Sequence, residues 1–298
     1  MQEPEAIGDS VQVSIVIPAY NEEAAIGADL DSIREAMDAS PYSYEVIVVD
    51  DGSRDRTAEV VRERPWVRLL QHPQNRGTGA ARNTGTQAAR GEVVGMTDGD
   101  GTYPVRDFPQ MFATLIEGNH DMVIGARRRE AGTVRLLRSS AKWFIRKLAC
   151  YLTQTDIPDL NSGMRAFRKE VWQEFRNILP NTHSWVSTIT IAALSNGMSV
   201  AFMPIDYFPR KGRSSFHPIR DTYNYISLVV RSVMYFNPLR IFLPATLVLF
   251  VIAVVKLLRD FIVYRSFYVP AITLMIFLTA IQIGALGLLA DLIVRKTR

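Results

Sequence analysis

The sequence predicts an α/β domain built on a mainly parallel sheet, with helices on both faces, followed by two membrane-crossing helices. Three observations support this. Short runs rich in Val and Ile alternate with stretches of helical spacing, several of these runs end in polar residues, and the longest apolar segments lie near the C-terminus. Alternating strands and helices are typical of parallel sheets. About 20 apolar residues suffice to cross a bilayer.

Composition excludes several classes of protein. The chain has 298 residues, 48% of them hydrophobic and 21% charged, which is ordinary for a globular protein and excludes a disordered chain or a coiled coil. One Cys and four His exclude a disulfide scaffold or a zinc finger. The first ten residues have neither a basic nor an apolar region, so we expect no signal peptide.

The expected elements alternate along the first hundred residues. The strands are β-branched runs, and the helices are longer stretches with apolar residues at helical spacing. We expect strands at 13–17, 45–49, 67–70 and 92–96, and helices at 22–37, 57–64 and 78–90. Three of the strands lead into polar clusters, at Pro18 to Glu22, Asp50 to Ser53 and Asp98 to Asp100. Ligands of parallel sheets bind at the carboxyl ends of strands, so we expect the site there.

The C-terminal part changes character. Residues 241–255 and 266–290 carry no charge, and Lys256, near the end of the first segment, would extend its ammonium to the interface. Two buried core helices are the alternative interpretation. Stretches 139–152 and 221–236 are amphipathic and are either surface helices or helices at a membrane interface.

Charge is distributed unevenly between the two parts. Residues 1–204 are net negative and residues 205–298 net positive, so the pI of 9.2 indicates attraction to anionic lipid and not to nucleic acid. The positive-inside rule places both ends of the two spans in the cytosol. We expect a cytosolic domain over 1–218, an interfacial helix and linker over 219–240, and two transmembrane helices over 241–294, in the inner or cell membrane.

The acidic and glycine-rich clusters suggest a chemistry. Asp98 and Asp100, one residue apart after a strand, suit Mg2+ or Mn2+, although a solvated acidic turn is the alternative. Asp51 would accept hydrogen bonds from a nucleobase, and Tyr20 would pack on that base. The backbone at Gly77 and Gly79, before a helix, suits a pyrophosphate or is a simple turn.

Together these clusters resemble inverting family-2 glycosyltransferases with the GT-A fold. The resemblance rests on segments 18–23, 50–53 and 98–100, in that order, and on the later segments 159–165 and 209–215. With Asn237-Pro238-Leu239-Arg240 and two C-terminal spans, it narrows to polyprenyl-phosphate glycosyltransferases, the group that includes dolichyl-phosphate mannose synthases and bacterial relatives.

The resemblance implies roles for individual residues. Those expected to bind the nucleotide are Pro18, Tyr20, Glu22, Asp51, Gly77 and Asp98. Those expected to hold the metal are Asp98 and Asp100, and those expected to act in catalysis are Asp159, Asp100 and Arg127, with Asp159 as the possible base. Those expected to bind the acceptor or its phosphate are Ser162, Arg165, Arg210 and Arg213.

Departures from the family pattern bear on the donor and on the acceptor. Thr102 replaces a Gln common in mannose synthases, which disfavours GDP-mannose, whereas Thr78 and Ser215 replace lysines, the second of them a contact of the acceptor phosphate. Because segment 98–104 resembles that of relatives using uridine diphosphate sugars, the expected reaction is transfer from UDP-glucose or UDP-N-acetylglucosamine to a polyprenyl phosphate, with GDP-mannose as the alternative donor. Two competing hypotheses are a processive polysaccharide synthase and a non-catalytic membrane binding module. A homo-oligomer stays open, because Ala280 and Gly284 form a small-residue pair of the kind that packs helices.

Overall fold

The protein is described by a computed structural model that covers residues 11–128, 153–182, 184–209, 237–264 and 269–296, and positions 147, 150, 151, 230 and 234. Several predicted features lie outside these residues. They are most of the stretches 139–152 and 221–236, the boundary between 218 and 219, and both Arg210 and Arg213. Those predictions stay open.

A seven-stranded sheet forms the centre of the α/β domain, in the order β3-β2-β1-β4-β6-β5-β7. Only β6 is antiparallel to its neighbours, β4 and β5. The strands are β1 (Val13–Ala19), β2 (Tyr44–Asp50), β3 (Val67–Gln71), β4 (Val93–Met96), β5 (Met122–Arg127), β6 (Arg165–Arg168) and β7 (Val200–Ile205). The predicted mainly parallel sheet and its first four strands are confirmed.

The helices of this domain also follow the prediction over its first half. They are α1 (Ile26–Asp38), α2 (Thr57–Arg62), α3 (Thr78–Ala88), η1 (Val105–Asp107), α4 (Phe108–Glu117), α6 (Lys169–Phe175) and α7 (Trp185–Ser195). Helix α1 begins four residues later than expected. Asn21 has a positive φ of 57°, and the Glu22 amide donates to Thr57 Oγ1, so these residues form a turn that is tied to the first residue of α2.

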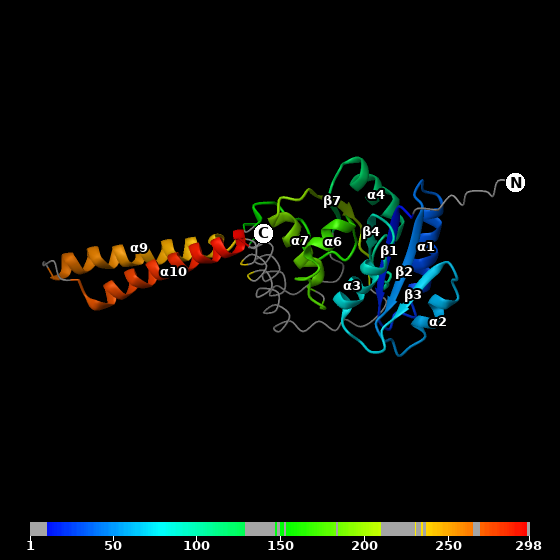
Figure 1. Ribbon diagram of the computed structural model, residues 1–298, viewed down its shortest axis with the longest axis horizontal. Coiled ribbons are helices and arrows are strands. Elements are labelled where there is room, and N and C mark those ends of the chain that lie inside the picture. Colours follow the sequence, from blue (N-terminus) through cyan, green and yellow to red (C-terminus); the bar gives the residue numbers. More distant parts are fainter. Residues whose placement is uncertain are drawn as a thin grey trace.

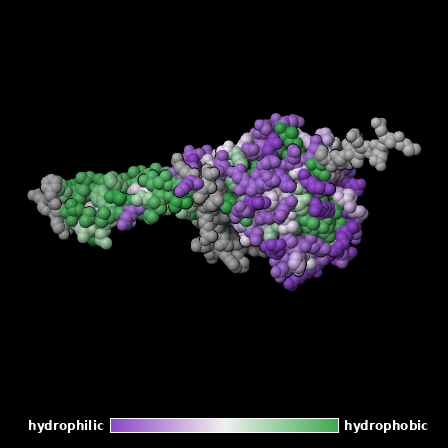
Figure 2. Space-filling view, in the orientation of Figure 1, coloured by the Kyte–Doolittle hydropathy of each residue, from purple (hydrophilic) through white to green (hydrophobic). Residues whose placement is uncertain are grey.

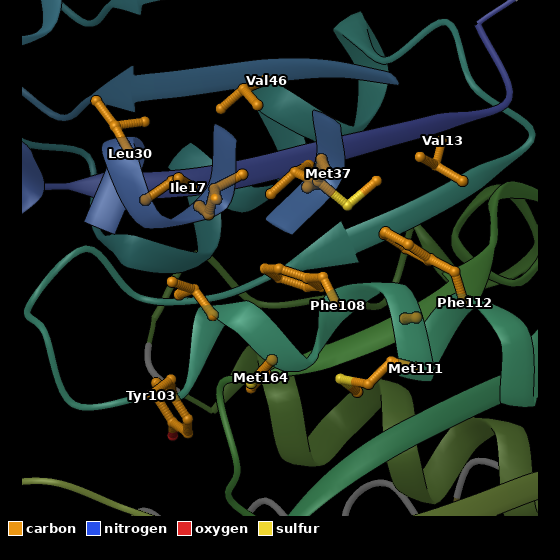
Figure 3. Packing of buried hydrophobic residues seen from close by; sticks show 14 of the residues in the cluster. Val13, Ile17, Leu30, Met37, Val46, Tyr103, Phe108, Met111, Phe112 and Met164 are labelled. Atoms are coloured by element: carbon orange, nitrogen blue, oxygen red, sulfur yellow. The ribbon is translucent and has the colours of Figure 1, made fainter. Parts of the chain in front are cut away.

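Two hydrophobic cores lie on opposite faces of the sheet. Alternate residues of β1 point to opposite sides, so Ile15 and Ile17 belong to one core and Val16 to the other. Helices α1 and α4 cover the first face, where the rings of Phe108 and Phe112 stack with their centres 5.6 Å apart (Figure 3). Helices α3, α6 and α7 cover the second face. Each fully buried side chain of this size contributes about 1.5–3 kcal/mol, so the two cores stabilise the sheet whose edge carries the polar clusters.

A helical hairpin of α9 (Leu239–Tyr264) and α10 (Ala271–Lys296) extends away from the α/β domain (Figure 1). Residues 239–263 and 271–294 are long and apolar enough to cross a membrane, and only 6% and 17% of these windows are buried inside the protein. Figure 2 shows the resulting apolar surface beside the polar α/β domain. Because the part of the chain that the structure describes does not cover these helices, the alternative of buried core helices is wrong.

Small residues bring the two helices of the hairpin together. A Cβ at Gly287 would lie 2.5 Å from Phe242 Cβ, and one at Gly284 would lie 3.2 Å from Thr246 Cγ2. Ala280 is also buried. Ala280 and Gly284 therefore pack within one chain, and the homo-oligomer stays a prediction. Near the far end of the hairpin, Lys256 Nζ and Thr273 Oγ1 both donate to Asp260, at 2.8 and 3.0 Å.

Candidate functional site

The polar clusters meet at the carboxyl edge of the sheet. Strands β1, β2 and β4 are neighbours and parallel, and they end at Ala19, Asp50 and Met96. Two of the loops are joined directly, since the Asn21 amide donates to Ser53 Oγ at 2.9 Å. Pro18 lies within β1 opposite Val49, whereas Tyr20 is 41% exposed beside the edge. The exposure of Tyr20 leaves its ring accessible to a planar ligand.

Asp51 organises the loop that leads into α3. Its carboxylate lies 2.6 Å from His72 Nδ1 and accepts from the backbone amides of Arg76 and Gly77 at 2.9 and 2.8 Å. His72 Nε2 lies 3.0 Å from Thr84 Oγ1. The sequence did not indicate His72, which is separated from Asp51 by 21 residues. The loop-ordering role is new, and the contact of Asp51 with a nucleobase stays a prediction.

Close packing explains why glycine occupies positions 77 and 79. Cβ atoms at both positions would lie 2.2 Å from backbone oxygens, of Asn181 and Pro180 respectively, and Gly77 has a φ of +96°. The Gly79 amide donates to the Asn181 carbonyl at 3.1 Å. This bond occupies one amide of the helix N-terminus that we expected to receive a pyrophosphate. The role of Gly77 in nucleotide binding stays a prediction.

Two aspartates follow β4, and the chain holds them differently. Asp98 has a side chain that is 31% exposed, and its Oδ1 accepts from Arg82 NH2 at 2.6 Å. Asp100 is buried, and its Oδ1 accepts from the amide and hydroxyl of Thr102 at 3.2 and 2.6 Å. Thr102, the departure from the family pattern, thus orders the acidic turn.

Arg127 and Asp159 form an ion pair at the end of β5. Arg127 donates from Nε to Asp159 Oδ2 at 2.6 Å and from NH2 to Oδ1 at 2.9 Å, and both side chains are largely buried. The backbone amides of Arg127 and Asn161 also donate to this carboxylate. Burial raises the pKa of Asp159, but the hydrogen bonds and the charge of Arg127 outweigh burial and hold the pKa below its ordinary value.

Aromatic rings join this ion pair to the acidic turn. The Arg127 guanidinium lies 5.1 Å from the centre of the Tyr207 ring, and Tyr207 packs edge-on against Tyr103 at 5.2 Å. Tyr103 is buried, and its hydroxyl accepts from the Gly163 amide at 2.7 Å. Burial raises the pKa of Tyr103, so it stays neutral at physiological pH.

The comparison with protein families decides the identification. Residues 14–176 match the model of glycosyl transferase family 2, and residues 237–295 match the GtrB C-terminal hairpin. The chain belongs to glycosyl transferase family 2. Its C-terminal helices are therefore a GtrB-type hairpin, and the family expected from the motifs is confirmed.

Several curated relatives of this family-2 chain are similar in sequence. A dolichyl-phosphate beta-glucosyltransferase of Trichomonas vaginalis is 32% identical over 66% of this chain and 64% of its own length. A dodecaprenyl-phosphate galacturonate synthase of Rhizobium johnstonii is 27% identical over 76% and 68%. A dolichyl-phosphate hexose transferase of Haloferax volcanii is 33% identical over 69% and 87%. The match with the first of these spans less than two thirds of that relative.

Solved structures confirm the GT-A fold. Glucosyl-3-phosphoglycerate synthase from Mycobacterium tuberculosis, solved with phosphoglyceric acid, has a TM-score of 0.60 at 21% identity and covers 74% of this chain and 80% of its own. The same enzyme with Mn2+, UDP-glucose and phosphoglyceric acid has a TM-score of 0.59, also at 21% identity, covering 74% and 79%. Identity this low establishes the shared fold alone.

The carboxylates of the acidic turn in this family-2 domain fit a divalent cation. Among the described residues, no three His, Cys, Asp or Glu side chains gather as a complete metal site. Two carboxylates, Asp98 and Asp100, lie at one turn, and Asp98 is accessible. Mg2+ is typically bound through one or two carboxylates together with substrate phosphates and water. The two carboxylates of this turn therefore suit Mg2+ or Mn2+ as part of the ligand set.

Two predicted acceptor-binding residues lie inside the protein. Ser162 and Arg165 are fully buried, and Arg165 donates to the Val186 and Ser162 carbonyls and to Thr190 Oγ1. Burial, followed by the charge of Arg82, lowers the pKa of Arg165 to about 9. The structure does not bring these side chains into the accessible part of the site, because Arg165 turns inward to satisfy carbonyls around α7.

Proposed function

We propose that this family-2 glycosyltransferase transfers a hexose from a nucleotide sugar to the phosphate of a membrane polyprenyl phosphate. The observation that carries the proposal is the junction between the site and the hairpin. Ile157 and Leu160, on either side of Asp159, belong to a buried cluster against which Ile241 of α9 packs. The segment that presents Asp159 therefore rests on the base of the helix that leads into the membrane.

The relatives support an acceptor of this class. Those of Trichomonas vaginalis and Haloferax volcanii are named as dolichyl-phosphate transferases, and that of Rhizobium johnstonii as a dodecaprenyl-phosphate galacturonate synthase. For the donor we propose UDP-glucose or UDP-N-acetylglucosamine. Thr102 in place of Gln and the beta-glucosyltransferase name of one relative favour such a donor over GDP-mannose, which stays the alternative.

A divalent metal completes the donor site in this proposal. Asp98 and Asp100 would hold Mg2+ or Mn2+, which supplies positive charge for the leaving nucleoside diphosphate. Arg127 would donate to phosphate oxygens at the same edge of the sheet. Pro18, Tyr20, Glu22, Asp51 and Gly77 are proposed to bind the nucleotide.

The acceptor needs little help from a base. A phosphate monoester has a second pKa of about 6, so its oxygen is already ionised near neutral pH. Asp159 already accepts four N–H groups, which fills the acceptor capacity of a carboxylate. We therefore assign Asp159 the orientation of Arg127. The acceptor oxygen attacks the anomeric carbon opposite the leaving group, so the configuration inverts.

The membrane arrangement follows from the hairpin. We propose that α9 and α10 both cross the cell membrane, with the catalytic domain on the cytosolic side, where the nucleotide sugar is available. Basic residues of segment 205–240, among them Arg210 and Arg213, would lie at the headgroups and would attract the anionic lipid phosphate.

A donor panel tests the proposal. Purified full-length protein in detergent, with Mn2+ or Mg2+ and a polyprenyl phosphate, would receive UDP-glucose, UDP-N-acetylglucosamine and GDP-mannose separately, and mass spectrometry would detect the lipid product. One polyprenyl-phosphate hexose is the expected product. A growing polymer would indicate a processive synthase. Nucleotide binding without transfer from any donor would contradict the proposal and favour the binding module.

A further inference from the structure

Two arginines lie in the core beside the site, and their contacts differ. Arg165 donates to two carbonyls and a hydroxyl. Arg82, on α3, is only 3% exposed, and its guanidinium makes a single hydrogen bond among the described residues, to Asp98 Oδ1. Its Nε is buried and has no hydrogen-bond partner within the described part of the chain. The hydrogen bonding of the Arg82 guanidinium is therefore directed at one carboxylate of the acidic turn.

A rigid scaffold supports Arg82. Its guanidinium lies 5.9 Å from the centre of the Trp185 ring, which is fully buried. The side-chain oxygen of Asn83 accepts from the indole N–H groups of Trp185 and Trp172, at 2.8 and 3.0 Å. Asn83 is the next residue of α3. The helix thus fixes both the arginine and the ring beneath it, which leaves little freedom for the guanidinium.

Such an arrangement disfavours stability. Burying a guanidinium costs solvation, an unmade Nε hydrogen bond adds to the cost, and the nearby positive charge of Arg165 repels it. Because the Asp98 side chain is 31% exposed, water can solvate its carboxylate when Arg82 is replaced by an apolar residue, so loss of this one partner should leave no uncompensated buried charge. A role in stability alone therefore does not explain an arginine at this position, whereas a role at Asp98 does.

The other oxygen of Asp98 is also confined. A Cβ at position 163 would lie 2.5 Å from Asp98 Oδ2, so only a glycine there leaves room for the carboxylate in this orientation. Arg82 NH2 donates to the other oxygen of this carboxylate, Oδ1, at 2.6 Å. The side chain stays 31% exposed between these two constraints. Its orientation toward the site is thus fixed before any ligand binds.

We propose that Arg82 is a positioning residue that orients Asp98 for the nucleotide–metal complex of the donor. The inference rests on the proposed function, because it assigns Asp98 to that complex. Arg82 acts through Asp98 and is buried away from the surface. Its removal should therefore weaken donor binding while leaving the fold intact.

The test compares Arg82→Met with Arg64→Met in full-length protein. Arg64 NH2 forms an ion pair with Oδ2 of Asp31, a residue of α1, at 2.7 Å. This pair lies outside the site and so provides a matched arginine–carboxylate control. Calorimetry would measure the affinity for UDP with Mn2+, and for GDP with Mn2+ in parallel, without acceptor. We expect at least tenfold weaker binding of the preferred nucleotide for Arg82→Met, an unchanged or higher melting temperature, and wild-type binding for Arg64→Met. Arg82→Lys should restore part of the affinity.

The remaining outcomes separate the hypotheses. Arg82→Met binding within twofold of a wild type that binds nucleotide would overturn this inference and leave the proposed function standing. Joint loss of melting temperature and affinity, with both restored in proportion by Arg82→Lys, would overturn it in favour of a structural role. A wild type that binds neither UDP nor GDP would overturn the proposed function and this inference together.

Discussion

The α/β domain and the hairpin place the same kinds of side chain in opposite environments. All seven residues of β1 are buried inside the domain, while charged side chains such as those of Arg106 and Glu35 lie on its surface. In the hairpin, Leu247 and Ile272 point outward, while the side chains of Asp260 and Thr273 are buried between the helices. Water surrounds a surface of the first kind, and lipid suits one of the second. The difference indicates which solvent each region meets.

The two regions meet beside the site. Ile241, at the base of α9, packs on the cluster that contains Ile157 and Leu160, and Asp159 lies between them. The proposed reaction needs a site at such a boundary, because its donor would arrive through water and its lipid acceptor would stay in the bilayer. The contrast between the regions is therefore also an argument about where the reaction takes place.

Truncating one leucine in each region is the test of this comparison with the largest expected effect. Leu30 of α1 is fully buried in the domain core, whereas Leu278 of α10 is half exposed on the hairpin. We expect Leu30→Ala to lower the free energy of unfolding by about 2–5 kcal/mol through the lost contacts and the cavity. Leu278→Ala should cost less than about 1 kcal/mol, because lipid tails are as apolar as leucine. Thermal and denaturant unfolding in a lipid-like detergent would measure both, and equal losses would contradict the assignment of the hairpin surface to lipid.

Asp100→Asn tests the chemistry of the domain separately from its fold. The substitution removes a charge at the acidic turn, so we expect sugar transfer to fall about 100-fold or more, as when a key electrostatic group is removed from an active site. Thr102 can still donate to the remaining carbonyl oxygen, so the melting temperature should change little. Asp38→Asn, on the exposed end of α1, is the control. Near-normal transfer by Asp100→Asn would remove Asp100 from the catalytic site.

The sequence predicted what depends on local patterns. Four strands, three helices and the hairpin follow from hydrophobic periodicity and segment length, and Asp98 and Asp100 follow from their position after a strand. Strand β6 has only four residues, and its antiparallel pairing depends on contacts with β4 and β5 that lie far away along the chain. Local patterns carry no information about such pairing.

Hydrogen bonds between residues far apart in the sequence explain why the sequence did not predict every contact of the site. Arg82 reaches Asp98 across 16 positions and Asp159 reaches Arg127 across 32, so no local motif reveals either pair. Arg165 lies in a motif of the family, but its direction depends on α7, which follows it in the chain. An inward-facing arginine and an outward-facing one are indistinguishable in the sequence.

Asp159→Asn tests whether Asp159, at the junction of the two regions, orients Arg127 or acts as a base. The pKa of Asp159 is below its ordinary value, so its contribution to stability is present above about pH 4 and lost as the pH falls through the folded-state pKa. Asp159 thus stays ionised throughout the assay range. We expect roughly tenfold slower transfer, the factor for one hydrogen bond to a charged group, from poorer orientation of Arg127.

The pH–rate profile separates orientation from base catalysis. With Asp159 as an orienting residue, the wild type and Asp159→Asn should share one acidic limb, near the second phosphate pKa of about 6. Arg127→Lys combined with Asp159→Asn should be scarcely slower than Arg127→Lys alone, because the two residues act as a unit. A limb that disappears in Asp159→Asn, with additive losses in the double variant, would restore the base role.

The smallest expected effect concerns the water-facing surface of the α/β domain. Arg106 and Glu35 form an ion pair at 2.9 Å, and both side chains are about two-thirds exposed. Water and salt screen such a pair, so Arg106→Gln should change the free energy of unfolding by about 0.2–1 kcal/mol, and by less at high ionic strength. Denaturant titrations at low and high salt would measure this. A larger loss of unfolding free energy that does not depend on salt would mean that this surface of the α/β domain is covered in the working protein. The domain would then have a protected face of its own, in addition to the apolar surface of the hairpin.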